Sequence, residues 1–589
     1  MVSDNLVQNI GLTTVFLGGL GWYILHRKTK NKVGFISPSK TIHKDDSFLG
    51  DHEIARQGFT SKRVPDNLDI IVIGAGVSGM TVAACMAREG KRVLVLEQHD
   101  VAGGNTHVFQ EKGYEFDTGL HYVGGKLGNK TSSTRKIFDY ITLEGGIQWE
   151  AMDDNFDVAK IHGTQDGFTF HKNIKQNIAN LKRKFPQDVE AIDKYFKLVK
   201  ESVASMPFMF LKDLLPPFLA WLLKPIIKWR TKLFRMTSLE ILSTYTSNHD
   251  LIGTLTYCYG DYGETPKRGS FGMNALITAH YNGGAYYPVG GPSVIAPPII
   301  RLIESVGGKV LVRAPVTSII IDSKLGKATG VEVKGKSIFA PMIISSIGSI
   351  NTYKKLIPEN CSHAIKNELQ AIKNVDIAPE TSLMSLFVGI DKLPEDIKLP
   401  KNNVWLYPSW DHDGNWESYK KNMNEPFPVV FISFPSAKDK TYQERCPEKD
   451  VALVIAGASY DSFEEYSELR VRHRGDEYEK IKENLTNRLL TTLYSEYPGI
   501  KDYVDFVELG TPLSNDFYLG TYRGAIYGLS HSPARFDCDC LTSVRTPIKG
   551  LYLSGQDVVC DGIQGALMSG LKTCAVISPS FRPKLIKLL

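Results

Sequence analysis

The cysteines of this sequence form no pattern that indicates a metal site or a disulfide framework. Eight cysteines are scattered along 589 residues, and no CxxC pair occurs. The closest two, Cys538 and Cys540, are separated by one residue, which is too short a spacing for easy bridging. These absences argue against a structural zinc site and against a small secreted disulfide scaffold. They favour free thiols in a reducing compartment.

The sequence also lacks a strong excess of charge of either sign. Its formal net charge is +5, with 42% hydrophobic and 23% charged residues, as in ordinary globular proteins. So small a net charge predicts no nucleic-acid partner, although local basic patches could still face anionic lipid. The length exceeds what one simple core accommodates, and two or three domains are expected.

A second dinucleotide-binding fingerprint is absent, but one complete copy lies at Asp69–Gln98. An apolar run, Ile70–Ile73, meets the turn Gly74-Ala75-Gly76-Val77-Ser78-Gly79. A helix-compatible segment, Met80–Glu89, follows, and a second apolar run, Val93–Leu96, ends at Glu97. This order of strand, glycine turn, helix, strand and acid predicts a site for an adenine dinucleotide.

Each residue of this fingerprint has a distinct physical task. Gly74 permits the sharp turn, Gly76 lets backbone approach a pyrophosphate, and Gly79 lets helix and strand pack closely. The helix N-terminus offers free N–H groups and a positive dipole end to the phosphates. Glu97 can accept from ribose hydroxyls and would repel a 2′-phosphate, so FAD or NAD is expected rather than NADP. With one fingerprint, a second tightly held NAD(P)H is not predicted.

The N-terminus has no Lys or Arg ahead of its long apolar run, Leu6–Leu25. The basic cluster His26–Lys32 comes after the run, which favours a retained membrane anchor with the body of the protein in the cytosol. A cleaved signal with a lumenal body, or an apolar tail packed on the domain, are the alternatives. We predict an anchor or signal-anchor at 1–32 and a polar linker at 33–66.

A second apolar segment, Met206–Phe234, is broken by Pro216-Pro217, which argues against a straight membrane span. Two tryptophans and four basic residues are typical of a helix lying in the headgroup region: Trp221, Trp229, Lys224, Lys228, Arg230 and Lys232. The alternative is a pair of core helices beneath a substrate lid. We favour contact with lipid because the basic residues gather at one end.

The rest of the chain divides into blocks of different character. Residues 130–250 are predicted to be mainly helical. Strands and helices are further expected at Tyr114–Asp117, Ser293–Val306, Lys309–Val312, Val316–Ile321, Gly330–Val333, Pro341–Ser345, Thr381–Ile390, Pro428–Phe434, Asp476–Tyr497, Leu551–Ser554 and Gln564–Ile577. Near the C-terminus, Gly555, Asp557 and Gly562 follow a strand and open a helix, which favours a cofactor role over plain completion of a sheet.

These motifs together resemble the all-trans-retinol 13,14-reductase (retinol saturase) and carotenoid isomerase branch of the phytoene desaturase and flavin amine oxidase superfamily. The resemblance rests on LVLEQHDVAGGNTHVF, EFDTGLHYVGG, GGAYYPVGG, YGLSHSPARF and LYLSGQDVVCDGIQGAL, and it covers roughly residues 66–580. It implies an α/β fold with a discontinuous Rossmann-like FAD-binding domain (67–129, 285–350 and 546–580). An inserted α+β substrate and membrane-contacting domain (130–284 and 351–545) and an N-terminal membrane helix complete the expected organisation.

Carried over by position, the resemblance implies ten FAD-binding residues: Gly74, Gly76, Gly79, Glu97, Gly103, Gly104, Val316, Gly555, Asp557 and Ile563. No nucleophile–base pair stands out, and a flavin alkene reductase would not require one. Four residues are candidate proton donors or substrate-facing groups: His121, Tyr122, Tyr287 and His531.

The implied activity is FAD-dependent saturation of a carbon–carbon double bond in a retinoid or related polyene lipid, at the endoplasmic reticulum membrane. Polyene isomerisation or desaturation is the close alternative. A non-enzymatic alternative is isoprenoid binding, as in Rab escort and GDP-dissociation inhibitor proteins, and a soluble amine oxidase is a third. The electrons could come from NADPH that docks transiently or from another protein, and the sequence leaves both alternatives open.

Overall fold

The computed structural model describes residues 50–143, 146–376 and 382–589. The predicted anchor at 1–32 lies outside the described residues, as does most of the predicted linker. Within the described ranges, no helix combines the length and the apolar character needed to cross a bilayer.

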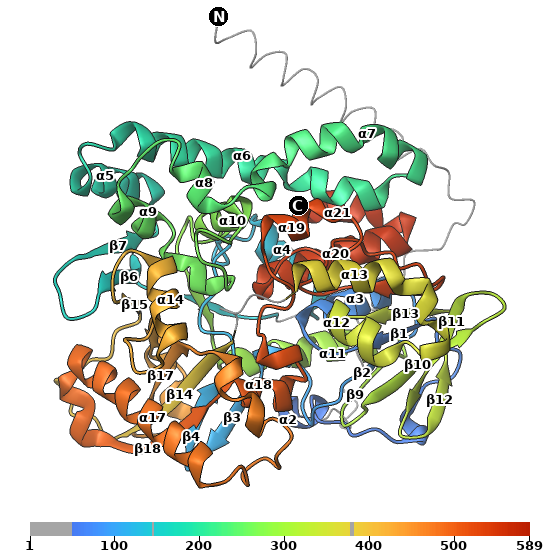
Figure 1. Ribbon diagram of the computed structural model, residues 1–589. Coiled ribbons are helices and arrows are strands. Elements are labelled where there is room, and N and C mark those ends of the chain that lie inside the picture. The colour runs from blue at the N-terminus through green and yellow to red at the C-terminus, as the bar shows by residue number, and fades with distance from the viewer. Residues whose placement is uncertain (1–49, 144–145, 377–381) are drawn as a thin grey trace, which may run out of the picture.

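A five-stranded parallel sheet forms the centre of one half of the molecule (Figure 1). Its order is β19-β13-β1-β2-β9, with bounds Leu551–Leu553, Met342–Ser345, Ile70–Ile73, Val93–Leu96 and Lys309–Leu311. The Val, Ile and Leu runs of β1 and β2 are buried along their whole length, as expected for parallel strands covered on both faces. The sheet draws strands from all three segments predicted for the FAD-binding domain.

Alternate residues of β1 and β2 pack on different layers. Ile70 and Val72 lie in a core with helices α3 (Val77–Arg88), α11 (Ala296–Glu304) and α20 (Gly562–Ile577). Ile71 and Ile73 lie in a core with a small antiparallel sheet made of β10 (Val316–Asp322), β11 (Lys327–Val333) and β12 (Lys336–Phe339). This layering of helices, parallel sheet and a second sheet is a Rossmann-like α/β arrangement.

The other half of the molecule is built on a seven-stranded mixed sheet of order β18-β14-β17-β16-β15-β6-β7 (Figure 1). The strands are Val504–Gly510, Leu383–Asp391, Lys449–Gly457, Val430–Ser433, Asn403–Tyr407, Asn155–Ile161 and Gly167–His171. Two of these strands, β14 and β16, were predicted. The helical prediction for residues 130–250 is wrong at β5 (Trp149–Ala151), β6 and β7. The charged Asp157 obscures the strand pattern of β6, and it is tolerated there because the distant Asn403 donates to it.

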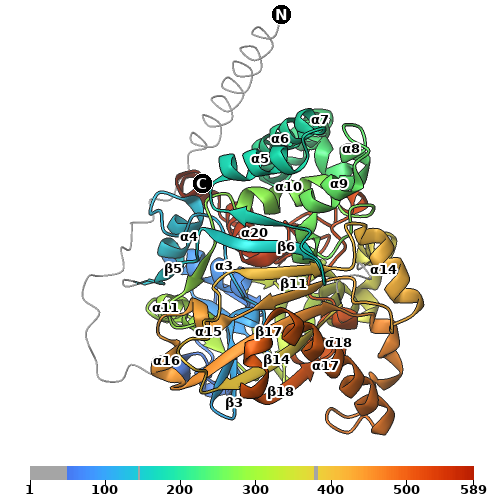
Figure 2. The same cartoon turned by 90° about the vertical axis from the view of Figure 1, so that its left-hand side faces the viewer.

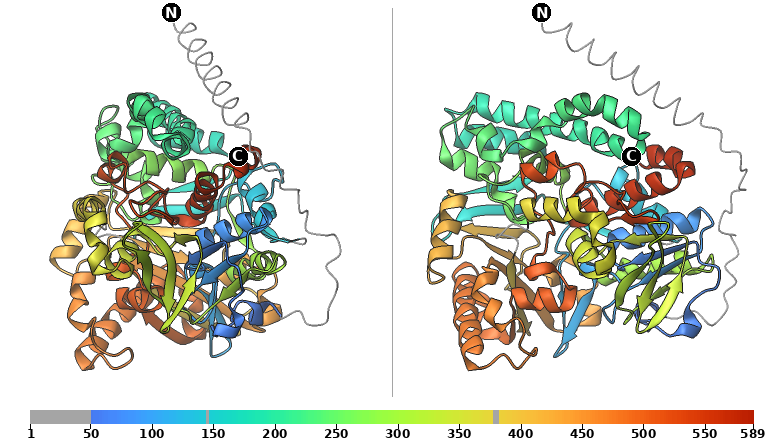
Figure 3. Two further views of the ribbon diagram at one scale, coloured as in Figure 1. Left: turned by 90° about the vertical axis from the view of Figure 1, so that its right-hand side faces the viewer. Right: turned by 45° about the vertical axis from the view of Figure 1, so that its right-hand side comes forward.

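A helical layer lies across the seven-stranded sheet and α20, as the turned views show (Figure 2, Figure 3). It comprises α5 (Ile174–Lys184), α6 (Val189–Leu214), α7 (Pro217–Arg230), α8 (Ser238–Leu242), α9 (His249–Leu255) and α10 (Phe271–His280). The break predicted at Pro216-Pro217 is confirmed: α6 ends before the two prolines and α7 begins at the second. Proline is tolerated there because the first helical N–H has no partner within the helix.

The remaining elements are short or peripheral. The antiparallel pair predicted around Tyr114–Asp117 is confirmed as β3 (Val108–Glu111) with β4 (Tyr114–Asp117), and β8 (Tyr286–Pro288) pairs with β5. The other helices are α2 (Asp51–Ile54), α4 (Ser133–Ile141), α12 (Ser349–Asn351), α13 (Lys366–Val375), α14 (His412–Lys421), α15 (Pro435–Lys438), α16 (Tyr442–Arg445), α17 (Asp476–Glu496), α18 (Pro512–Leu519), α19 (Pro533–Asp537) and α21 (Arg582–Leu588).

The described end of the predicted linker packs on the Rossmann-like half. Ile54 and Ala55 are buried in the core that contains α11. The Gln57 Nε2 donates to Glu304 Oε1 at 2.8 Å, and Arg56 pairs with Asp100 at 2.9 Å. The linker prediction therefore extends too far, because two apolar residues in a polar stretch are enough to attach it to the domain.

Candidate active site

A cavity of about 1010 Å³ lies between the two halves, with walls from both large sheets. One end is bounded by the glycine turn after β1, the Gly103-Gly104 loop and the start of α20. The other end is bounded by β14 to β17, by α10 and by Val203 and Met206 of α6. A cavity of this size is at the upper end of those that hold small ligands, which are roughly 300–1,000 Å³.

The glycine turn has the geometry that its sequence predicts. Gly74 has a φ of +96°, which favours glycine. A Cβ on Gly79 would lie 2.2 Å from the Gly74 carbonyl oxygen, so helix α3 approaches β1 as closely as only glycine permits. A Cβ on Gly76 would meet no described atom within 4 Å, and Gly76 lines the cavity. Its backbone is therefore open to a phosphate.

A second glycine loop crosses the first. Gly103 forms a β-bridge with Gly76, and a Cβ on Gly104 would lie 2.9 Å from the Gly76 Cα atom. The N-cap residue of α3 and that of α20 make no side-chain capping hydrogen bond, and both helices begin at the cavity wall. Two uncapped helix N-termini and open glycine backbone form the anion-binding surface that a pyrophosphate requires.

The Glu97 carboxylate is held at the end of β2 by backbone donors. Its Oε2 accepts from the Ala75 N–H and its Oε1 from the His99 N–H, each at 2.9 Å. A carboxylate oxygen has more than one acceptor site, so ribose hydroxyls can still donate to it. This orientation suits the predicted role.

Asp557 joins two backbone segments at the same end of the cavity. Its Oδ2 accepts from the Ser349 N–H at 2.6 Å and its Oδ1 from the Leu529 N–H at 2.9 Å. A Cβ on Gly528 would lie 2.3 Å from Asp557 Oδ1, so glycine is needed beside it. Asp557 therefore has a structural task in addition to its predicted contact with the ribityl chain.

All ten residues predicted to bind the cofactor line this one cavity, although they come from segments almost 500 residues apart. Their chemistry fits FAD: open glycine backbone and helix N-termini for the pyrophosphate, a carboxylate for the ribose, and a chamber beyond them for a ring system and a substrate. The individual contacts stay predictions.

The candidate proton donors divide into two groups. His121 and Tyr122 line the cavity. Burial, followed by the charge of Lys438, lowers the pKa of His121 to about 3, so its imidazole is neutral at physiological pH. The Nδ1 atom of His121 is buried and has no hydrogen-bond partner among the described residues.

Tyr287 and His531 do not line the cavity, and the prediction that they face substrate is wrong. The Tyr287 hydroxyl donates to the Asp117 carboxylate at 2.7–2.8 Å, which satisfies a buried acid. His531 is fully buried, and its Nε2 accepts from the Asp561 N–H at 3.2 Å. Both side chains serve the core, because a buried carboxylate and a buried helix start each need a partner.

The chamber beyond the flavin positions has mostly apolar walls with one polar cluster. The apolar lining includes Met273, Leu276, Ile277, Trp405 and Phe431. The polar cluster contains Asp261, Tyr122 and Tyr281, and the two tyrosine rings are stacked 4.6 Å apart. Asp261 was not predicted. The only signal was an acid beside Gly260 in a stretch expected to be helical.

Comparison with solved structures agrees with this fold. The family model described as an NAD(P)-binding Rossmann-like domain matches residues 72–141. An oxidoreductase from Methanosarcina mazei is 13% identical with a TM-score of 0.54, over 86% of this chain and 99% of that one. A putrescine oxidase is 15% identical with a TM-score of 0.53, over 87% and 98%. Fold and cavity thus define a protein with a Rossmann-like dinucleotide-binding domain.

Sequence relatives narrow this class. All-trans-retinol 13,14-reductase of Danio rerio is 38% identical over 546 residues, which is 89% of this chain and 88% of that protein. A Danio rerio protein named inactive all-trans-retinol 13,14-reductase is 32% identical, over 95% and 93%. Prolycopene isomerase of Daucus carota is 27% identical, over 83% and 76%. The chain belongs to the all-trans-retinol 13,14-reductase family, and the predicted resemblance is confirmed.

Proposed function

We propose that this protein binds FAD and saturates a carbon–carbon double bond of a retinoid, in the manner of all-trans-retinol to 13,14-dihydroretinol. One observation carries the proposal: a single cavity has the ten predicted cofactor positions at one end and an apolar chamber at the other. Reduced flavin, when bound, supplies a hydride.

The residues of the chain hold the two partners and exclude water. Gly76, Gly103 and Gly104 offer backbone to the pyrophosphate, and Glu97 accepts from the ribose. The chamber walls, including Trp405 and Phe431, orient a flat, apolar polyene against the flavin. Exclusion of water protects a reduced flavin, and holding both partners in one cavity raises the effective concentration of the reacting carbon.

Isomerisation of a polyene is the second candidate, favoured by the similarity to prolycopene isomerase. Isoprenoid binding without catalysis predicts a protein that carries no flavin. For the electron donor we propose transient NADPH or a protein, since only one complete dinucleotide fingerprint is present.

The proposed reaction predicts a product that has gained two hydrogens. Purified protein should show the visible absorption bands of flavin. After anaerobic photoreduction it should convert all-trans-retinol to a dihydro product, measured by mass spectrometry with flavin reoxidation followed in parallel. An unchanged mass with an altered retinoid spectrum would establish isomerisation instead. Absence of flavin would contradict both enzymatic proposals.

We further propose that α7 lies on a lipid surface, at the endoplasmic reticulum membrane with the body in the cytosol. Four large apolar side chains of this helix face solvent: Trp221 is 71% exposed, Phe218 68%, Trp229 58% and Leu222 54%. So large an exposed apolar face is unusual unless it meets a partner. The hairpin of α6 and α7 also contributes Val203 and Met206 to the cavity wall, which suits a substrate drawn from a bilayer.

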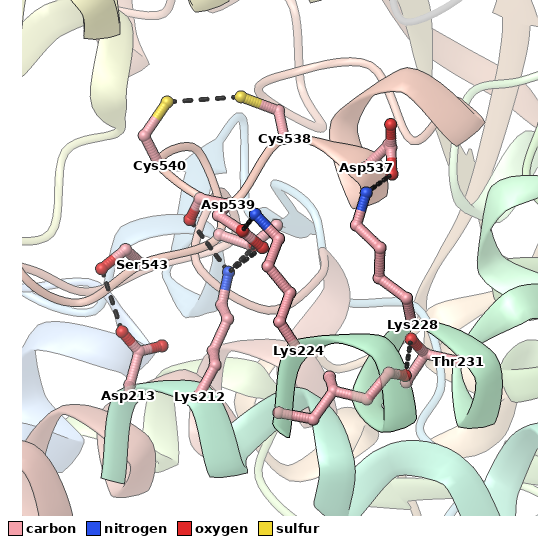
Figure 4. A network of polar contacts seen from close by, with 12 residues as sticks. Lys212, Asp213, Lys224, Lys228, Thr231, Asp537, Cys538, Asp539, Cys540 and Ser543 are labelled. Atoms are coloured by element: carbon pink, nitrogen blue, oxygen red, sulfur yellow. Dashed lines mark hydrogen bonds and ion pairs between the residues drawn. The ribbon is translucent and has the colours of Figure 1, made fainter. Parts of the chain in front are cut away.

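Two of the four basic residues predicted to face lipid headgroups, Lys224 and Lys228, are instead paired with carboxylates. Lys224 pairs with Asp539 at 2.7 Å and Lys228 with Asp537 at 2.7 Å, and Lys212 donates to the Asp539 carbonyl oxygen at 2.9 Å (Figure 4). These lysines attach the hairpin to the last residue of α19 and to the segment that follows it. The argument for lipid therefore rests on the exposed apolar face.

Lipid contact predicts quenching of two particular tryptophans. In full-length protein carrying Trp22→Phe and reconstituted in vesicles, brominated lipid should quench fluorescence. Adding Trp221→Phe and Trp229→Phe should remove most of the quenchable signal, because these rings would lie in the interface. The matched control is Trp416→Phe, since Trp416 is buried in the core, and it should leave quenching unchanged. Equal quenching in all three proteins would contradict the proposal.

A further inference from the structure

One acidic side chain reaches the chamber end of the cavity. Asp261 lines the cavity and is partly exposed, whereas the neighbouring Asp157 is completely buried. The Tyr122 hydroxyl lies 3.4 Å from Asp261 Oδ2 and 3.1 Å from Asp157 Oδ2. One phenol thus bridges two carboxyl groups, and one of these groups faces the space that substrate would occupy.

Burial raises the pKa of both carboxyl groups, that of Asp157 to about 7, and the hydrogen-bond donors around them favour a proton on Asp261. Asp157 is served by three donors: Tyr122, the Tyr257 hydroxyl at 3.0 Å and the Asn403 amide at 3.0 Å. A phenol has one hydrogen, so Tyr122 cannot also donate to Asp261. The contact between Asp261 and Tyr122 is satisfied when Asp261 is protonated and donates to the phenol oxygen.

The surroundings of Asp261 favour this neutral form. Burial raises the pKa of Asp261 well above its ordinary value, and the nearby carboxylates of Asp157 and Asp561 raise it further. Hydrogen bonds with Tyr122 and Tyr281 act in the opposite direction but are smaller. The titratable groups around it are Asp157 on β6, Tyr257 and Cys258 before it in the chain, Tyr281 after α10, Tyr122, Tyr527 and Asp561. Two basic side chains lie behind these groups: Lys438 Nζ is 5.7 Å from the centre of the Tyr122 ring, and the charge of Arg535 lowers the pKa of Asp561.

We propose that Asp261 is the catalytic acid that protonates the substrate alkene. This inference rests on the proposed function, with reduced flavin as the hydride donor. The hydride adds to one alkene carbon, and the alkene π electrons form a C–H bond at the other carbon with the proton of Asp261. The O–H electron pair stays on Asp261, which becomes a carboxylate and regains a proton before the next turnover. Tyr122 positions the acid, and His121 is excluded because its imidazole is neutral.

The deciding variant is Asp261→Asn, which keeps shape and hydrogen bonding but removes the acidic proton. Flavin content and retinol binding, followed by retinol fluorescence, should be unchanged. The single-turnover rate of the photoreduced protein with retinol should fall about 10²- to 10⁴-fold, the usual contribution of a general acid. The wild-type rate should fall as pH rises through the pKa of Asp261, because only the protonated form donates, and this alkaline limb should vanish in Asp261→Asn.

An infrared measurement tests the protonation state without turnover. The difference spectrum of wild type minus Asp261→Asn at neutral pH should contain the C=O stretch of a protonated carboxylic acid. The control Asp413→Asn replaces a half-buried acid whose pKa is also raised but which does not line the cavity, and its turnover should match wild type. The proposal would be overturned if Asp261→Asn kept the wild-type single-turnover rate and its fall with rising pH. Absence of the infrared band would overturn it as well. If wild type reduces no polyene, the proposed function fails, and the infrared band alone decides whether Asp261 holds a proton.

Discussion

Gly76→Asp is expected to abolish flavin binding while leaving the apoprotein as stable as wild type. Gly76 is the N-cap of α3, its backbone is extended, and a Cβ there meets no described atom within 4 Å. Aspartate is a good N-cap residue and is more favourable there than glycine by about a few tenths of a kcal/mol. Its carboxylate would occupy the place of the pyrophosphate and repel it.

Gly79→Ala should behave in the opposite way, lowering stability as well as flavin content. Its Cβ would lie 2.2 Å from a backbone carbonyl oxygen, so α3 must move away from β1. Overpacking of this kind costs about 1–3 kcal/mol. The comparison separates a glycine needed for ligand from a glycine needed for packing.

Both variants are measured by the ratio of flavin to protein absorbance and by thermal unfolding of deflavinated protein, since bound ligand itself raises the melting temperature. Gly58→Ala is the control, because a Cβ there meets no described atom within 4 Å and Gly58 does not line the cavity. Full flavin content in Gly76→Asp would show that the pyrophosphate does not bind at this turn.

Asp557→Ala should destabilise the protein and remove the flavin together. The substitution leaves the Ser349 and Leu529 N–H groups buried without their acceptor. Each unsatisfied buried donor costs about 1–3 kcal/mol, so a loss of roughly 2–6 kcal/mol in the free energy of unfolding is expected. The loss should appear in denaturant unfolding of both holo and apo protein.

Asp557→Asn is the matched comparison. Its side chain has one acceptor oxygen and would place an NH₂ group against the second backbone N–H. A stability between wild type and Asp557→Ala is expected, still with weakened flavin binding. Wild-type stability in Asp557→Ala apoprotein would show that the two segments do not depend on this carboxylate.

The cofactor end of the site could be predicted from sequence because its residues act through local backbone geometry. The bounds predicted for β1 and β2 match the structure, Gly74 and Gly79 have the turn and packing geometry expected of them, and the backbone of Gly76 is open as its predicted role requires. A turn, a helix start and a strand end are set by residues near one another in the chain. That is why a short motif carries the information.

The substrate end could not be predicted in the same way. Strand β6 is stabilised by β15, almost 250 residues later, and its buried Asp157 made the segment look unlike a strand. Tyr287 and His531 have side chains suited to catalysis. In the core, however, the Tyr287 hydroxyl donates to Asp117, and His531 Nε2 accepts from the Asp561 N–H. Asp261 is a candidate acid only because the fold places it beside Tyr122 and in the cavity wall.

The sequence by itself determined that Gly74–Gly79 forms the glycine turn of a Rossmann-like domain, that the chain belongs to the all-trans-retinol 13,14-reductase family, and that Met206–Phe234 breaks at Pro216-Pro217. Only the tertiary structure decided which acid faces the chamber, which tyrosine and histidine are core residues, and which side of α7 is exposed. The physical reason is that phosphate binding depends on backbone conformation, which is local. The protonation and exposure of a side chain depend on neighbours that folding brings from distant segments.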